Sequence, residues 1–113
     1  MHELTLALNI VQILEEKAIE HHFNQVKQVW LEMDALSCVE ESALLFGLHS
    51  AARHSLAEGA EFHIDLKPAN GWCHQCGDGF TTHQHTTTCP ACGSPEIHCE
   101  RSDALRIREL EVE

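Results

Sequence analysis

Residues 72–93 read WCHQCGDGFTTHQHTTTCPACG and contain two Cys-x2-Cys pairs separated by twelve residues. The cysteines are Cys73, Cys76, Cys89 and Cys92. Four thiolates in this spacing suit Zn(II), which binds sulfur tetrahedrally at about 2.3 Å. Glycine follows each pair, at Gly77 and Gly93, where it lets the chain reverse as it leaves the metal. The stretch predicts a zinc ribbon, and zinc closed by four thiolates has no open position for a substrate.

The chain has 113 residues, and the ribbon removes roughly thirty of them from any hydrophobic core. We therefore expect an inserted zinc-ribbon domain, residues 68–97, within a discontinuous α/β domain made of residues 1–67 and 98–113. The six cysteines could instead form three disulfides in a secreted protein. The N-terminus lacks the basic region of a signal peptide, and charged residues interrupt every long apolar run. A cytoplasmic protein whose thiols bind metal is the expectation, with no membrane partner.

The formal net charge is −11, from 18 acidic and 7 basic residues. No lysine or arginine lies between Lys67 and Arg101, a segment that contains four histidines. Nucleic-acid binding requires several cations to neutralise phosphates, so this segment disfavours DNA and RNA as partners. An acidic, histidine-rich surface instead suits cations or a basic protein as partners.

Apolar periodicity predicts two helices and three strands outside the ribbon. Helical spacing covers residues 4–19 and about 39–58, and strand patterns cover 26–33, 61–67 and 104–113. Ser37 and Glu40 fit a capping box ahead of the second helix. A strand-helix-strand unit prefers a parallel crossover, so the first two strands should be neighbours. The fold class expected is α+β, with a small mixed three-stranded sheet covered by two helices and the ribbon inserted.

The N-terminus carries a second candidate metal site. The α-amine of Met1, the amide nitrogen of His2 and its imidazole can together chelate one ion, and three in-plane nitrogens favour Ni(II) or Cu(II). Glu3 could supply a fourth donor through its backbone nitrogen or its carboxylate. A histidine at position 2 is more often a solvated terminal residue, so the pattern alone is weak.

The sequence from Met1 to Thr5, MHELT, together with the late four-cysteine ribbon resembles the HypA/HybF family of hydrogenase maturation accessory proteins. The resemblance spans the whole chain. It implies a cytoplasmic nickel metallochaperone that delivers Ni(II) to the large subunit of nickel-iron hydrogenase, with a GTPase accessory protein as a partner. It also implies that His2 binds nickel beside Glu3 and that the four cysteines hold structural zinc. Glu40 lies where relatives add a carboxylate to the nickel site.

Several residues have a simpler interpretation than metal binding. Glu40 would complete the capping box, Cys38 would be a small buried group, and Cys99 would face the sheet. Trp72 would cap the small ribbon core. The histidines of the ribbon segment are expected in solvated loops.

No catalytic residues are expected, since a zinc saturated by four thiolates cannot activate water. The leading hypothesis is therefore a nickel-binding and delivery protein rather than an enzyme. One alternative is a structural zinc-ribbon adaptor that recruits a protein without handling nickel. Another is a metal-dependent hydrolase, which would need an open zinc position. The oligomeric state stays open, a homodimer included.

Overall fold

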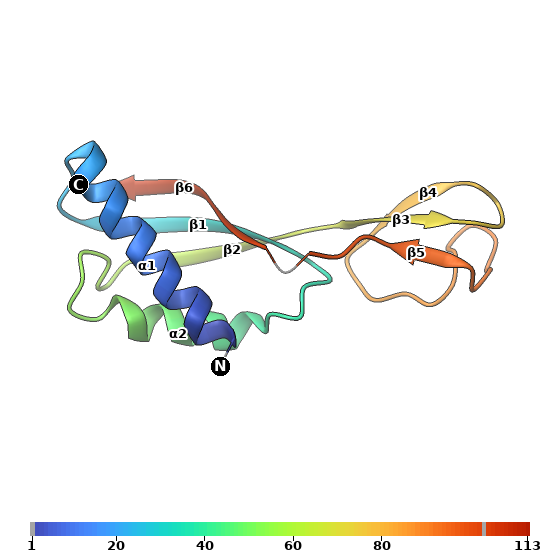
Figure 1. Cartoon of the computed structure of the whole chain (residues 1–113), viewed down its shortest axis with the longest axis horizontal. Coiled ribbons are helices and arrows are strands. Elements are labelled where there is room, and N and C mark those ends of the chain that lie inside the picture. The colour runs from blue at the N-terminus through green and yellow to red at the C-terminus, as the bar shows by residue number, and fades with distance from the viewer. Residues whose placement is uncertain (1, 103) are drawn as a thin grey trace. The chain divides into compact units, whose positions relative to one another are not determined.

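The structure is a computed structural model that describes residues 2–102 and 104–113 (Figure 1). Its elements are α1 (His2–His21), β1 (Val26–Asp34), α2 (Glu41–Ala52), β2 (Glu61–Lys67), β3 (Ala69–Cys73), β4 (Gly79–Thr82), β5 (Ile97–Cys99) and β6 (Leu105–Val112). The chain divides into two compact units. The helical unit comprises Met1–Glu32, Val39–Asp65 and Leu105–Glu113, and the ribbon unit comprises Met33–Cys38 and Leu66–Ala104.

The sheet that includes β1 has the strand order β2-β1-β6, so the first two predicted strands are neighbours, as expected. Strands β1 and β2 run parallel, because Gln28 bonds to His63 and, further along both strands, Ala35 bonds to Lys67. Strand β6 runs antiparallel to β1, because the Glu113 backbone bonds to Gln25 at the start of β1. The sheet is therefore mixed, as the α+β prediction required.

Helix α1 runs from His2 to His21 and so extends two residues beyond each end of the predicted range of 4–19. His22 adopts φ 59°, and the Phe23 amide donates to the Ala18 carbonyl at 3.2 Å. This left-handed residue and the backward bond form a Schellman-type C-cap, which satisfies carbonyls that the helix leaves unpaired. The buried stripe of α1 is narrower than its apolar sequence suggests and consists of Ala7, Ile10, Val11 and Leu14.

Helix α2 is shorter than the predicted range of 39–58. It ends at Ala52 because Arg53 turns to an extended conformation and His54 takes φ 63°. The His54 amide then donates to the Glu58 carboxylate at 2.6 Å, which closes a turn in place of further helix. The buried positions of α2 are Leu44, Gly47, Leu48 and Ala52.

One face of the β2-β1-β6 sheet is covered, since Val29, Leu31 and Met33 of β1 are buried, and polar contacts link side chains of the other, open face. Trp30 of β1 stacks on His63 of β2 with ring centroids 5.2 Å apart. Arg108 of β6 forms an ion pair with Asp65 at 2.9 Å and approaches Glu32 at 3.9 Å. These contacts pair the charges of the open face with one another.

The sheet of the ribbon unit has the order β4-β3-β5, with antiparallel pairing on both sides of β3. Directly paired residues share a face. One face is covered: Ala69 and Cys73 are buried, and the Phe80 ring lies over Gly71, where a Cβ would approach it to 2.3 Å. The other face is open and includes Trp72, paired with Gly79 and His98. Strand β3 begins at Ala69, directly after Pro68, and corresponds to none of the predicted strands.

Among residues 2–102 and 104–113, no helix has both the length and the apolar character needed to span a bilayer.

Candidate metal centres

The ribbon brings all four predicted cysteines to one point. Their sulfur atoms lie within 4.8 Å of one another, with Cys73 Sγ 3.6 Å from Cys92 Sγ and Cys76 Sγ 3.8 Å from Cys89 Sγ. Sulfurs at the corners of a tetrahedron around zinc, each at about 2.3 Å, lie about 3.8 Å apart. The cluster therefore fits a zinc-ribbon site in both donor type and spacing.

Two loops with the same hydrogen bonds present these sulfurs. In the first, the Cys73 amide donates to Asp78 and the Gly77 amide donates back to Cys73, both at 3.0 Å. In the second, the Cys89 amide donates to Ser94 and the Gly93 amide donates to Cys89, both at 2.8 Å. The two glycines have φ 76° and 75°, a conformation that other residues rarely adopt.

Backbone amides also point at the sulfurs. The Cys76 amide donates to Cys73 Sγ and the Ala91 amide to Cys89 Sγ, each at 3.4 Å. Amides of Cys92 and Ala91 lower the pKa of Cys89 to about 7. At Cys76 the Asp78 amide lowers the pKa, but the sulfur of Cys73, burial and the other sulfurs together raise it to about 12. Four close thiols cannot all ionise without a cation among them, and Zn(II) supplies that charge.

The predicted nickel residues lie where α1 and α2 begin. The side chain of His2 and the whole of Met1 lie outside the described residues, although the His2 backbone is the first residue of α1. Glu3 Oε2 accepts a hydrogen bond from the Glu40 amide at 3.1 Å. The structure therefore brings Glu3 and Glu40 together, at the N-termini of both helices.

Glu40 caps α2, but differently from the predicted capping box. Glu40 is itself the N-cap: its carboxylate accepts bonds from the amides of Ser42, at 3.2 Å, and Ala43, at 2.7 Å. The box with Ser37 as N-cap is wrong, because the helix begins at Glu41. The amide of Ala43, followed by the hydroxyl and amide of Ser42, lowers the pKa of Glu40. Both carboxylate oxygens already have partners in the helix cap.

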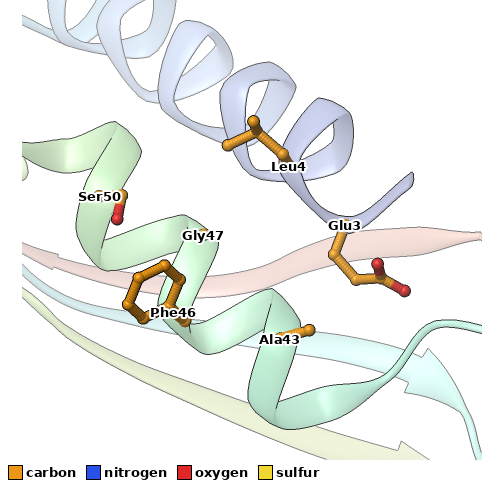
Figure 2. Close-up of a pocket in the computed structure, with 6 residues that line it drawn as sticks. All are labelled: Glu3, Leu4, Ala43, Phe46, Gly47 and Ser50. Atoms are coloured by element: carbon orange, nitrogen blue, oxygen red, sulfur yellow. The ribbon is translucent and has the colours of Figure 1, made fainter. Parts of the chain in front are cut away.

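A cleft opens beside Glu3, between α1 and α2 (Figure 2). It has a volume of about 220 Å³ and is lined by Glu3, Leu4, Ala43, Phe46, Gly47 and Ser50. The two helices pack closely at Gly47, where a Cβ would lie 3.4 Å from Ala7 Cβ. Phe46 is 75% exposed, and the Glu3 carboxylate points away from it, toward the start of both helices. Sequence reasoning missed this cleft, although α1 has more apolar residues than one buried stripe needs.

Other cysteines and histidines take no part in a described metal cluster. Among the described side chains, the four ribbon cysteines are the one group of three or more potential ligands that gathers. Cys38 is exposed, so the expectation of a buried residue is wrong, whereas Cys99 is half-buried on the covered face of β5. The four ribbon-segment histidines, His74, His83, His85 and His98, are exposed, as predicted, although His98 lies in strand β5 and not in a loop.

Residues 1–112 match the family model described as HypA, hydrogenase/urease nickel incorporation, metallochaperone. The chain belongs to the HypA family. Hydrogenase maturation factor HybF of Proteus vulgaris is 41% identical over 113 residues, and that of Escherichia coli K12 is 40% identical; each alignment covers both chains completely. Family membership makes the chain a hydrogenase maturation protein of the nickel metallochaperone type.

Solved HypA structures share the fold. The solution structure of the Ni metallochaperone HypA from Helicobacter pylori aligns with a TM-score of 0.67 at 18% identity, and covers 97% of this chain and 96% of that one. A further solution structure of a HypA protein aligns with a TM-score of 0.68 at 18% identity over 99% of this chain and 96% of that one. The predicted HypA/HybF resemblance and the α+β zinc-ribbon fold are both confirmed.

Proposed function

We propose that this chain binds one Ni(II) ion at its N-terminus and delivers it to the large subunit of nickel-iron hydrogenase in the cytoplasm. The α-amine of Met1, with the amide nitrogen and imidazole of His2, would hold the ion, and Glu3 would add a donor. Zn(II) on the four cysteines would hold the ribbon folded. The observation that carries the proposal is the family match across residues 1–112, which includes this terminus.

The start of α1 supports metal binding through backbone nitrogen. The first four amides of a helix have no partner within it, and α1 begins at His2. Coordination through the His2 amide would therefore break no hydrogen bond within α1.

The electrostatics of this end support loose binding. The positive ends of two helix dipoles lie here, and they oppose a bound dication. The carboxylates of Glu3 and Glu40 offset part of that charge, and the Glu40 carboxylate is already engaged by the cap of α2. A Kd on the order of 1 µM, roughly 8 kcal/mol, suits an ion that must be released to another protein.

Delivery requires contact with a partner next to the ion, and the cleft beside Glu3 offers the surface for it. Exposed Phe46 and Leu4 line an apolar depression at the same end of the helices. Apolar surface of this kind is typical of protein contact sites. A GTPase accessory protein, or the hydrogenase subunit itself, would dock there while nickel passes.

Calorimetric titration of the zinc-loaded, untagged protein with Ni(II) tests the function and its location together. We expect one site, which His2→Ala or one extra residue ahead of Met1 abolishes without changing the zinc content. His85→Ala is the matched control, because it removes an exposed histidine from the ribbon and should leave nickel binding unchanged. Stoichiometric nickel binding by His2→Ala would contradict the site, and absence of any nickel site would favour the structural adaptor.

A further inference from the structure

The two tryptophans of the chain lie in different surroundings. Trp30 of the helical unit is half-buried and stacks on His63. Trp72 of the ribbon unit is 49% exposed and projects from the open face of the β4-β3-β5 sheet. Its Cε3 atom lies 3.8 Å from where a Cβ of Gly79 would be, so the indole rests on a position without a side chain. An indole left this exposed, beside the metal cluster, is not explained by the ribbon core.

The indole forms one wall of a surface hollow of about 210 Å³. Its other lining residues are Asn70, Gly71, His98 and Glu100. The strand pairing fixes this arrangement: His98 lies opposite Trp72, and the Glu100 amide donates to the Asn70 carbonyl at 2.8 Å. The hollow therefore places an aromatic face near a carboxylate on one rigid sheet.

The charge of this region selects the ligand. Between Lys67 and Arg101 the charged side chains are Asp78, Glu96 and Glu100, and all are acidic. Zinc bound by four thiolates would add net negative charge directly behind Trp72, since its neighbour Cys73 is a ligand. A cation held over an indole and near a carboxylate is favoured by both groups, and arginine stacks on aromatic faces in this way. An anionic ligand would be repelled by the same charges.

We propose that the open face of the ribbon sheet is a docking surface for an arginine-bearing segment of a protein partner. The guanidinium would lie on the Trp72 indole and pair with the Glu100 carboxylate, while the Asn70 side chain offers a further acceptor. This site belongs to the ribbon unit, whereas the proposed nickel terminus belongs to the helical unit, and docking of arginine has no need of bound nickel. Exposed tryptophan and arginine are both enriched at the energetic centres of protein interfaces.

The two indole signals in a proton-nitrogen correlation spectrum provide the test. The full-length, zinc-loaded, ¹⁵N-labelled protein is titrated with a short end-blocked peptide of alternating arginine and glycine. We expect the Trp72 indole signal, assigned with Trp72→Phe, to shift and saturate while the Trp30 signal stays in place. The same peptide with neutral citrulline in place of arginine should shift neither.

Matched variants then separate specific docking from general attraction to an acidic protein. Peptide affinity for every variant is measured by calorimetric titration, because Trp72→Ala has no Trp72 indole signal. Trp72→Ala should weaken peptide binding about 3- to 30-fold, the range of one cation–π contact. Glu100→Gln should weaken it about twofold to fivefold, as for an exposed ion pair. Glu96→Gln removes the same charge outside the hollow, and its affinity should stay within about 1.5-fold of the parent because salt screens distant charges. Zinc content, measured for each variant, confirms that the ribbon is folded.

Three results would overturn the proposal. The first is that zinc-loaded Trp72→Ala and Glu100→Gln both bind the arginine peptide with the same affinity as the parent protein. The second is equal binding of the citrulline peptide. The third is a Trp72 signal that moves with protein concentration in the absence of peptide, which would assign the face to a second copy of this chain. None of these results bears on nickel binding, which the His2→Ala titration tests separately.

Discussion

The two units of this protein are stabilised in different ways. The helical unit buries complete apolar side chains between its helices and sheet, among them Leu14, Leu31, Leu44 and Leu48. Over the described residues from 66 to 104, the buried side chains are Ala69, Cys73, Cys89 and Ser94. So few buried groups cannot offset the entropy of ordering such a segment. Metal binding must replace the core there, whereas hydrophobic burial suffices in the helical unit.

Loss of one zinc ligand should give the largest difference between the units. Structural zinc contributes about 10–16 kcal/mol to folding in small zinc domains, more than the few buried groups of the ribbon can replace. We expect Cys89→Ser to lose zinc and unfold residues 66–102 while the helical unit stays folded. Hydrogen exchange read by mass spectrometry would show protection lost in β3, β4 and β5 and kept in α1 and β1.

Cys99→Ser is the control for that experiment, because Cys99 lies on the same sheet outside the sulfur cluster. It should keep its zinc and its exchange protection. If Cys89→Ser kept a protected ribbon without metal, the side chains alone would hold the ribbon and the contrast between the units would be lost.

A core truncation should have the opposite pattern. Leu44 of α2 is fully buried, so Leu44→Ala should lower the free energy of unfolding of the helical unit by about 2–5 kcal/mol and leave zinc content unchanged. Leu8→Ala removes the same group from a position that is 54% exposed, and its effect should be within about 0.5 kcal/mol. Urea denaturation followed by far-ultraviolet circular dichroism measures both. Similar losses for the two variants would place the core elsewhere.

A smaller effect should reveal what packing the ribbon does have. A methyl group at Gly71 would overlap the Phe80 ring, whereas one at Gly79 would make ordinary contacts at 3.7 Å or more. Gly71→Ala should therefore destabilise the ribbon by about 1–3 kcal/mol through overpacking. Competition with a zinc chelator, measured as the rate of zinc release, should be faster for Gly71→Ala than for Gly79→Ala. Equal rates would mean that the Phe80 ring does not support the metal loops.

The smallest effect is a pH dependence confined to the helical unit. The pKa of Glu40 is lowered in the folded state by the amide of Ala43 and by Ser42, so its ionised form stabilises α2. That stability is complete above the ordinary glutamate pKa of about 4.5 and is lost as pH falls through the lower folded pKa. Glu40→Gln should therefore be less stable than the parent at pH 7. The difference in stability between the two proteins should narrow as the pH falls below the ordinary glutamate pKa. A gap that widened on acidification would contradict the cap.

Sequence patterns predicted the parts of the fold that depend on local chemistry. The cysteine spacing located the sulfur cluster, and the alternation in 61–67 matched β2 from Glu61 to Lys67. The patterns failed where long-range pairing decides the structure. Strand β3 was not among the predicted strands, yet it runs through Asn70 and Gly71 because β4 and β5 pair with it on both sides. Trp72 was predicted to cap the ribbon core, but it lies on the open face of β3. The same strand pairing decides which face of β3 its side chain occupies.

The candidate nickel site was predictable only in part. The family resemblance implied that Glu3 and Glu40 both lie near the nickel site, and a hydrogen bond between the two residues brings them together. The spacing of Ser37 and Glu40 matched a capping box, but Glu40 makes equivalent bonds with its own carboxylate and leaves Ser37 outside the helix. One side chain can fulfil a cap in two registers, and sequence alone does not choose between them.

The matching hydrogen bonds of the two cysteine loops bear on how metal enters the ribbon. Each loop carries two cysteine sulfurs and orders its own backbone through hydrogen bonds within the loop. The chain therefore presents two preorganised bidentate ligands rather than four independent donors. Zinc would then bind in two steps: one cysteine pair coordinates the ion first, and the second pair coordinates it when the loop between the pairs closes. The rate of zinc binding would be set by that loop closure. A chelator that displaces either cysteine pair would release the ion.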